Sequence, residues 1–172
     1  MKNNIRQRTI KLKPATGEIE LEAFGLTNGM DNVRPVMLFK EKGGDAVLPV
    51  WLSPLDAGIA LSQHQPGPFM LSPHDMTLSV LKELGVKVEE CHFNELKGHQ
   101  QYVELTFSGS KNLKSMKARA DHAISFCLQA RAKFYCTREY LQQCRQLGAE
   151  AENGARMVAR NEGKRNRPEY MN

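Results

Sequence analysis

The sequence has 172 residues, of which 41% are hydrophobic and 25% are charged, and this balance predicts one compact domain with short tails. The formal net charge of +5 is concentrated at the ends, since residues 1–13 hold five basic side chains and no acidic one. No apolar run reaches the roughly 20 residues of a membrane span, and the basic N-terminus lacks the apolar stretch of a secretion signal, so we expect a cytoplasmic protein with no membrane partner.

The charge divides the chain into three parts. We expect a basic N-terminal arm over residues 1–15, a compact domain over residues 16–148 and a basic, polar C-terminal tail over residues 149–172. Basic ends of this kind bind polyanions such as RNA or DNA, but ordinary solubilising tails have the same composition. Charge alone leaves both interpretations open.

The first half of the chain contains three predicted strands and a helix. The strand segments are rich in Val, Leu and Phe and cover residues 18–27, 33–40 and 46–52. Gly43 and Gly44 supply the backbone angles of a tight turn, so the second and third strands are expected to pair antiparallel. A helix is expected over residues 54–64, because Pro54 suits its first position.

A second helix is predicted to begin at Ser-Pro-His-Asp. Ser72 suits the N-cap, Pro73 the first helical position and Asp75 the third, where a carboxylate bonds back to the cap. This capping role explains Asp75 and leaves His74 unexplained. Four apolar side chains then repeat at helical spacing before Gly85, which predicts a helix with one buried face. They are Met76, Val80, Leu81 and Leu84.

The second half of the chain alternates strands and helices irregularly. Strands are expected over residues 86–96, 101–108, 112–118 and 133–136, and helices over residues 119–131 and 138–147. Hairpins stand where a doubly wound fold would have crossover helices. The sequence therefore predicts an α+β domain with a mainly antiparallel or mixed sheet and three to four helices.

Four cysteines lie in this half, at positions 91, 127, 136 and 144. None approaches the Cys-x-x-Cys spacing of a zinc knuckle or a thioredoxin-type site. We therefore expect buried free thiols.

Two stretches of the chain resemble motifs of the bifunctional nuclease family. Leu-Pro-Val-Trp-Leu at residues 48–52, with Asp56 before an alanine, resembles the family's Leu-Pro-Ile-Trp-Ile-Gly strand and the acidic residue that follows it. His74 and Asp75 resemble the family's Thr-His-Asp-Leu helix start. With a third motif further along, the likeness covers about residues 19–145 in the same order.

The third motif of the family, Asp-x-Arg-Pro-Ser-Asp-Ala, resembles residues 117–123 only in part. Arg119 stands at the arginine, while Lys117 and His122 stand where the family has aspartates. Asp121 lies one residue before the second aspartate position, which on a helix is a rotation of about 100°. A divalent metal held by the family's two carboxylates would lose both ligands here.

The resemblance implies a nuclease that hydrolyses RNA and DNA phosphodiesters and forms a homo-oligomer. Its candidate catalytic residues are His74, Asp75 and Asp56, and Arg119 is the candidate phosphate-binding residue. His74 would shuttle a proton and Arg119 would clamp a phosphate. Asp56 or Asp75 would position water or a divalent cation such as magnesium. The sequence leaves the cofactor undetermined.

The departures from the third motif support a second hypothesis. Replacing two acids by a lysine and a histidine favours a catalytically degenerate family member that binds nucleic acid or another protein. In that case the basic arm would supply affinity that falls as salt concentration rises. The sequence predicts membership of the family and leaves catalytic activity open.

Overall fold

The computed structural model describes residues 17–28, 34–62 and 72–146. The predicted N-terminal arm and C-terminal tail lie outside these residues, as do the last two residues of the helix predicted to end at residue 64. Among the described residues, no helix is both long and apolar enough to cross a membrane.

The described residues form a seven-stranded mixed sheet with the strand order β3-β2-β1-β7-β4-β5-β6. Neighbouring strands are antiparallel except β4 and β7, which are parallel. The strands are β1 (Glu18–Asn28), β2 (Pro35–Glu41), β3 (Val47–Trp51), β4 (Lys87–Lys97), β5 (Gln100–Ser108), β6 (Ser115–Arg119) and β7 (Lys133–Thr137). The helices are α1 (Pro54–Ser62), α2 (Pro73–Glu83), α3 (Ala120–Gln129) and a helix over residues 138–146. This architecture confirms the predicted α+β class.

The local turn chemistry explains the first hairpin. Gly43 has a φ of 78°, which suits glycine in the turn between β2 and β3. The two strands pair antiparallel as predicted, with Phe39 opposite Leu48. The last strand before α3 differs from its prediction, because β6 begins at Ser115 and runs through Arg119. Arg119 therefore pairs with Tyr102 of β5 and ends a strand instead of starting a helix.

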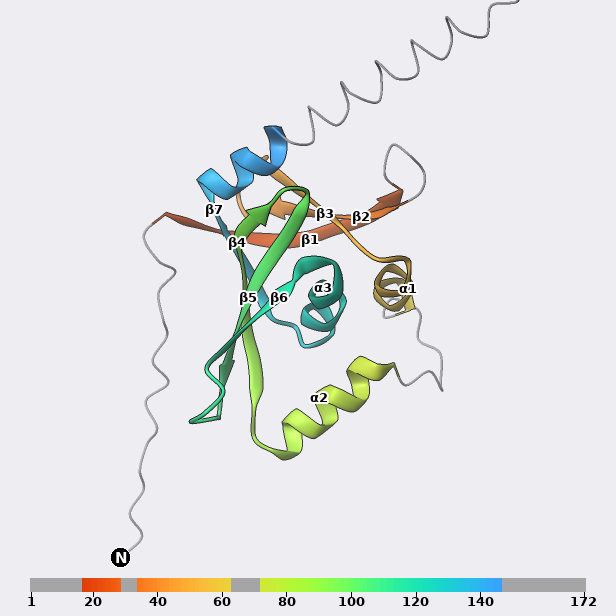
Figure 1. The fold of residues 1–172 in the computed structure, drawn as a ribbon, viewed down its shortest axis with the longest axis vertical. Helices are drawn as coiled ribbons and strands as arrows, with labels where there is room; N and C mark the ends of the chain where they lie inside the picture. The colour runs from red at the N-terminus through yellow and green to blue at the C-terminus, as the bar shows by residue number, and fades with distance from the viewer. Residues whose placement is uncertain (1–16, 29–33, 63–71, 147–172) are drawn as a thin grey trace, which may run out of the picture.

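The sheet curls around α3. Its two edge strands, β3 and β6, both contact this helix, which therefore lies in the angle between the two groups of strands (Figure 1). Register shifts in β1 and β4 supply bends, because an extra residue in one strand of a pair increases its twist. The side-chain nitrogen of Gln101 on β5 bonds to the carbonyl of Pro49 on β3 at 3.0 Å, which ties the two ends of the sheet together.

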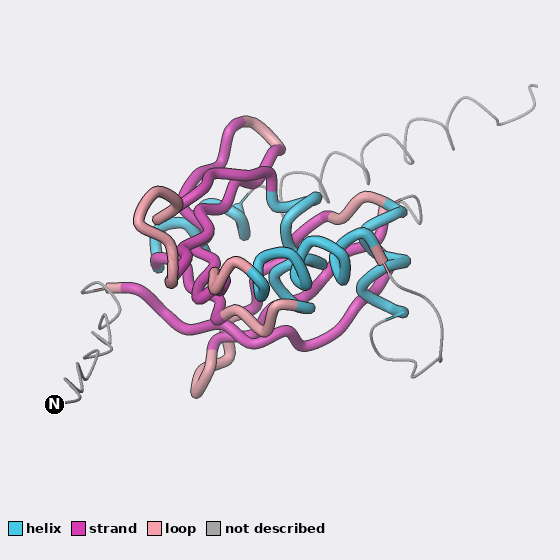
Figure 2. Tube along the Cα trace, turned by 90° about the horizontal axis from the view of Figure 1, so that it is seen from below, coloured by secondary structure: helices cyan, strands magenta, loops and turns pink. Residues whose placement is uncertain are grey.

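The hydrophobic core fills the concave side of the curled sheet. Figure 2 shows helices gathered with strands around them. Phe39, Phe93 and Ile124 are each at most 1% exposed, and the two phenylalanine rings meet edge to face with centroids 5.5 Å apart. Burying a side chain of this size stabilises a fold by roughly 1.5–3 kcal/mol. All four cysteines are buried free thiols, as predicted.

The predicted buried face of α2 was wrong for three of its four residues. Met76, Val80 and Leu84 expose 66%, 59% and 68% of their surface. Of the four predicted residues, Leu81 alone packs against the core, and Leu78 joins it there from the opposite side of the helix. Apolar residues on α2 form two stripes, and helical spacing alone does not say which stripe meets the rest of the protein.

Candidate active site

The first turn of α1 holds a buried carboxylate. Asp56 is only 5% exposed. Ser53, just before the helix, accepts a hydrogen bond from the Asp56 backbone N–H at 3.1 Å, and its hydroxyl donates to Asp56 Oδ2. Pro54 occupies the first helical position, where its missing N–H is not needed. This local motif fixes the carboxylate at the start of the helix.

Helix α3 supplies two more partners for this carboxylate. The Ser125 hydroxyl donates to Asp56 Oδ1 at 3.0 Å, and His122 Nδ1 lies 3.3 Å from Asp56 Oδ2. His122 and Ser125 are three residues apart, so both project from one side of the helix. Three side chains therefore surround a buried carboxylate, which is the compensation that a buried charge requires.

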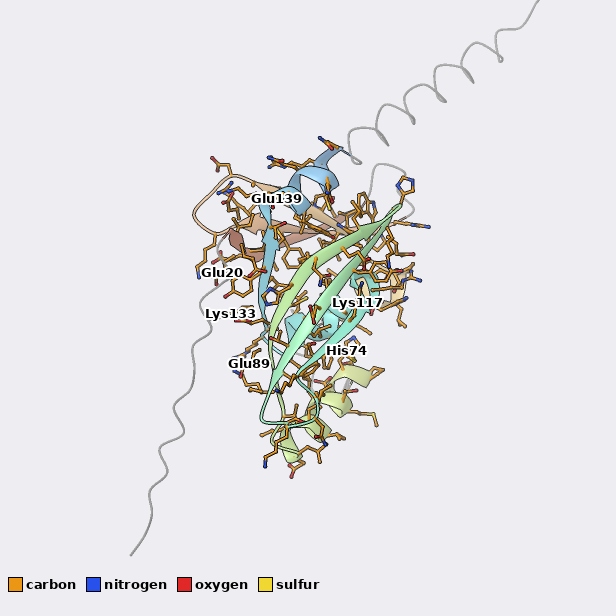
Figure 3. All side chains as sticks on the ribbon, turned by 60° about the vertical axis from the view of Figure 1, so that its left-hand side comes forward. Glu20, His74, Glu89, Lys117, Lys133 and Glu139 are labelled. Atoms are coloured by element: carbon orange, nitrogen blue, oxygen red, sulfur yellow. The ribbon has the colours of Figure 1, made fainter. Side chains whose placement is uncertain are left out.

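His74 reaches the same carboxylate indirectly. Its Nε2 lies 2.9 Å from Ser125 Oγ and 3.9 Å from Asp56 Oδ1, and its ring meets Phe126 edge-on. Ser125 has one hydroxyl proton and gives it to Asp56, so His74 Nε2 must donate to Ser125 Oγ. The His74 side chain is 17% exposed (labelled in Figure 3). It points into the domain, and its Nε2 carries a proton.

His122 is the more accessible imidazole. Its side chain is 57% exposed, while the carboxylate of Asp56 behind it is buried. A neutral ring that donates Nδ1–H to Asp56 has Nε2 as its acceptor. Nε2 lies 3.9 Å from Asp121 Oδ1, which is too far for a hydrogen bond. A buried carboxylate behind an exposed imidazole is the arrangement that orients a general base.

Arg119 stands beside this pair. It ends β6 and occupies the N-cap position of α3 without a side-chain capping bond, and its side chain is 44% exposed. Its Nε donates to Asp121 Oδ1 at 3.0 Å and its Nη2 donates to the other oxygen. These bonds raise the pKa of Arg119. Within the described part of the chain, Asp121 accepts from two of the five N–H donors of the guanidinium. Three donors are then left for an acceptor such as a bound phosphate.

A surface hollow of about 340 Å³ is lined by Arg119 and His122. It lies where the two edges of the curled sheet approach each other, because the ends of β3 and β6 and the starts of α1 and α3 all border it. The residues that matter for its chemistry are Arg34, Ser53, His99, Arg119, Asp121 and His122. Two imidazoles and two guanidiniums in one hollow form a site suited to a phosphate group.

The structure separates one predicted residue from the others. Asp56 and His74 share the hydrogen-bond cluster, and Arg119 lies next to it. Asp75 belongs elsewhere: its carboxylate accepts from the backbone and hydroxyl of Ser72 at 2.8 and 2.9 Å, and from the Gln129 amide. The bond from the Ser72 backbone is the main cause that lowers the pKa of Asp75.

Sequence reasoning missed the partners that complete the cluster. The sequence pattern presents His122 only as the loss of an acid and indicates no role for His99, Ser53 or Ser125. One signal was available: Ser-Pro-Leu-Asp before α1 repeats the Ser-Pro-His-Asp pattern before α2. The contact between Asp56 and His122 spans 66 residues and leaves no local trace.

The described residues do not fit a tightly held divalent cation. No group of three or more His, Cys, Asp or Glu side chains is placed among them to share a metal ion. The oxygens of Asp56 already accept three hydrogen bonds, and both oxygens of Asp121 bind Arg119. Lys117, at the first aspartate position of the resemblance, forms an ion pair with Glu95.

Comparison with known proteins finds a family model and two relatives that match this part of the chain. A family model described as the bifunctional nuclease domain matches residues 36–147, which include Asp56, His74, Arg119 and His122. Two relatives from Mycobacterium tuberculosis are described as uncharacterized proteins, MT1877 of strain CDC 1551 / Oshkosh and Rv1829 of strain ATCC 25618 / H37Rv. Each is 27% identical over 125 residues, covering 72% of this chain and 74% of the relative.

Proposed function

The chain belongs to the bifunctional nuclease domain family, and on that premise we propose that it cleaves phosphodiester bonds of nucleic acid in the hollow lined by His122 and Arg119. One observation carries the proposal: an exposed imidazole, backed by a buried carboxylate, lies beside an arginine in the same hollow. General acid–base catalysis and phosphate binding need these groups side by side.

The proposal gives each side chain a separate task. His122 Nε2 takes the proton of the attacking hydroxyl, while Asp56 holds the ring through Nδ1–H and stabilises the imidazolium that forms. Arg119 binds the phosphate through the donors that Asp121 does not use. His74 and Ser125 position Asp56 from behind.

Two candidate residues from the sequence take new roles in this proposal. His74 becomes a positioning residue, because its Nε2 faces Ser125 inside the domain. Asp75 becomes a helix cap, because its oxygens accept from Ser72 and Gln129. Replacing His74 by alanine should still lower activity, but less than replacing His122.

Cleavage of labelled single-stranded RNA and duplex DNA tests the proposal directly. We expect His122→Gln to lower the cleavage rate by about 10²–10⁴-fold, the usual contribution of a general base. Arg119→Ala should mainly weaken substrate binding. The matched control is Arg138→Ala, since Arg138 also forms an exposed ion pair, with Glu41, but lies outside the hollow. Full activity in His122→Gln would rule out this site.

A second candidate function is binding without cleavage. It is supported by Asp121, which already holds two donors of Arg119 and so weakens any bond to phosphate. If it is correct, the wild-type protein binds RNA or DNA and cleaves neither, and Asp121→Asn binds more tightly. Deleting residues 1–13 should lower both the affinity and its dependence on salt concentration. An unchanged salt dependence would show that the N-terminal arm does not contribute to binding.

The expected homo-oligomer remains a prediction. Light scattering of the purified chain at several concentrations measures it without any assumption about the active site. The dependence of cleavage on magnesium is also a question for measurement. Each cleavage assay is run with magnesium, with manganese and with a chelator.

A further inference from the structure

We infer that Trp51 stacks against an unpaired base of the nucleic acid bound in the hollow, so that the site takes a single strand and not a closed duplex. This inference rests on the proposed function and adds a base-binding residue to it. Both RNA and DNA offer the chemistry that the contact needs, which is a flat base attached through its sugar to a phosphate.

Trp51 lies outside the core while it borders the proposed site. It is the last residue of β3, which is an edge strand of the sheet (Figure 1). Leu48 and Val50 of the same strand are 0% exposed, so alternation along the strand places Trp51 on the opposite, outward face. Trp51 is half-buried and lines the hollow together with Arg119 and His122.

Val36 on β2 supports the indole from the sheet. Trp51 and Val36 are directly opposite each other in the antiparallel pair, where Cβ atoms on one face lie about 4.5–5.5 Å apart. Val36 is only 6% exposed although it lies on the outward face, and Trp51 is the neighbour placed to cover it. An indole that is held on one side loses little freedom when a base stacks on the other, and such preorganisation favours binding.

The indole has binding capacity that the described residues do not use. Within residues 17–28, 34–62 and 72–146, no hydrogen bond reaches its N–H and no other aromatic ring packs on it. The core ring of Phe39, in contrast, meets the rings of both Phe93 and Phe134. Aromatic rings gain from offset stacking on another flat ring, and a nucleobase is such a ring.

A backbone bond fixes Trp51 next to the first arginine of the hollow. The N–H of Leu52 donates to the carbonyl of Pro35 at 2.9 Å, so the pairing of β2 with β3 continues one residue beyond Trp51. Arg34, directly before Pro35, is thereby held at the neighbouring strand end, and it lines the same hollow. A guanidinium beside an aromatic ring is the combination by which proteins bind single-stranded nucleic acid.

A second bond fixes the distance from Trp51 to Arg119 across the hollow. The Gln101 side chain on β5 donates to the carbonyl of Pro49, two residues before Trp51, at 3.0 Å. The next residue of β5, Tyr102, pairs with Arg119 on β6. The fold therefore sets the spacing between the aromatic wall of the hollow and its phosphate-binding wall. A nucleotide has the matching form, because its base and its phosphate lie at opposite ends.

The hollow also limits what can reach the indole. Its volume of about 340 Å³ is at the lower end of the roughly 300–1,000 Å³ of small-ligand pockets. Bases inside a duplex stack on their neighbours, so only an unpaired or splayed-out base offers a free face to an aromatic side chain. The site is therefore expected to take one base of a single strand.

Tryptophan fluorescence tests this contact, because Trp51 is the only tryptophan in the sequence. We would titrate the protein with a short oligothymidylate, with an abasic strand of the same length, and with the oligothymidylate paired to its complement. The His122→Gln protein is titrated beside the wild type, since its slower cleavage keeps the strands intact. We expect the single strand to quench the fluorescence and the other two to leave it unchanged. Equal quenching by the duplex would overturn the requirement for an unpaired base.

Replacing Trp51 by leucine separates stacking from packing, since leucine still covers Val36 but has no flat ring. Anisotropy of labelled strands should show about 5- to 150-fold weaker binding of the single strand by Trp51→Leu and unchanged binding of the abasic strand. Trp51→Phe should restore part of the affinity. Phe24→Leu is the matched control, because Phe24 is 69% exposed on β1 and lines a different hollow. It should bind both strands as the wild type does.

Three other outcomes would overturn the inference. Equal weakening of the single and the abasic strand in Trp51→Leu would show that Trp51 has a structural role only. Equal binding of both strands by the wild type, without quenching, would remove the base contact but leave the proposed nuclease, which needs contacts to phosphate alone. Neither binding nor cleavage of any strand would overturn the inference and the proposed function together.

Discussion

Two helices of this protein begin with the same local pattern. Ser-Pro-Leu-Asp precedes and opens α1, and Ser-Pro-His-Asp precedes and opens α2. In each, the serine accepts a bond from the backbone N–H of the aspartate, at 3.1 Å for Asp56 and 3.2 Å for Asp75. In each, the serine hydroxyl also donates to the aspartate carboxylate. The two helix starts are built alike.

Their surroundings differ because α3 runs past both. The first half of α3 presents His122 and Ser125 to Asp56, which is buried. The end of α3 presents the Gln129 amide to Asp75. A local motif therefore places a carboxylate, while the neighbouring helix decides whether that carboxylate faces groups that move protons.

The largest expected difference between the two starts is in catalysis. Asp56→Asn removes the charge that orients His122, so cleavage of RNA should fall by about 10²–10⁴-fold. Asp75→Asn, the matched change at the other start, should keep nearly the wild-type rate. Circular dichroism checks that both variants are folded. Equal losses of cleavage rate in the two variants would show that the two helix starts do not differ in function.

The two α3 side chains that bond to these carboxylates, Ser125 and Gln129, should contribute differently to the free energy of unfolding. Ser125 is fully buried, so Ser125→Ala leaves an oxygen of Asp56 without its donor and should cost about 1–3 kcal/mol of unfolding free energy. Gln129→Ala should cost less, because Asp75 keeps both of its bonds to Ser72. Urea denaturation measures both. A larger loss in Gln129→Ala would contradict the greater burial of the Asp56 cluster.

The two serine caps should be alike in stability and unlike in activity. Ser53→Ala and Ser72→Ala each remove a helix cap, which costs about 1 kcal/mol. Only Ser53→Ala should also slow cleavage, since Ser53 bonds to the carboxylate behind His122. Denaturation curves and cleavage rates on the same two proteins separate the structural role from the catalytic one.

The smallest expected effect is the pH dependence of the cap on α2. The pKa of Asp75 is lowered in the folded protein, mainly by the bond from the Ser72 backbone. Its stabilising contribution is therefore complete above the unfolded-state pKa and is lost as pH falls through the folded-state pKa. The stability difference between wild type and Asp75→Asn should be constant above about pH 5 and shrink in more acidic solution. A difference that grows towards acid would contradict the lowered pKa.

Much of the fold follows from local sequence. The β2 and β3 hairpin depends on its glycine turn, and the start of α2 depends on Ser72, Pro73 and Asp75, so both were predictable. The packing face of α2 was not, because it depends on where His74 meets Ser125 and Phe126. The parallel pairing of β4 with β7 joins segments that are distant in the chain, and no periodicity reports such a pairing.

The sequence by itself determined the elements, the helix caps, the free thiols and the family, because these depend on neighbouring residues or on motifs read in order. Only the tertiary structure decided that Asp56 is the buried carboxylate and that His122 and His99 share a hollow with Arg119. The physical reason is the curl of the sheet around α3. It brings residues 66 positions apart into hydrogen-bond distance, and that distance is not encoded in any local pattern.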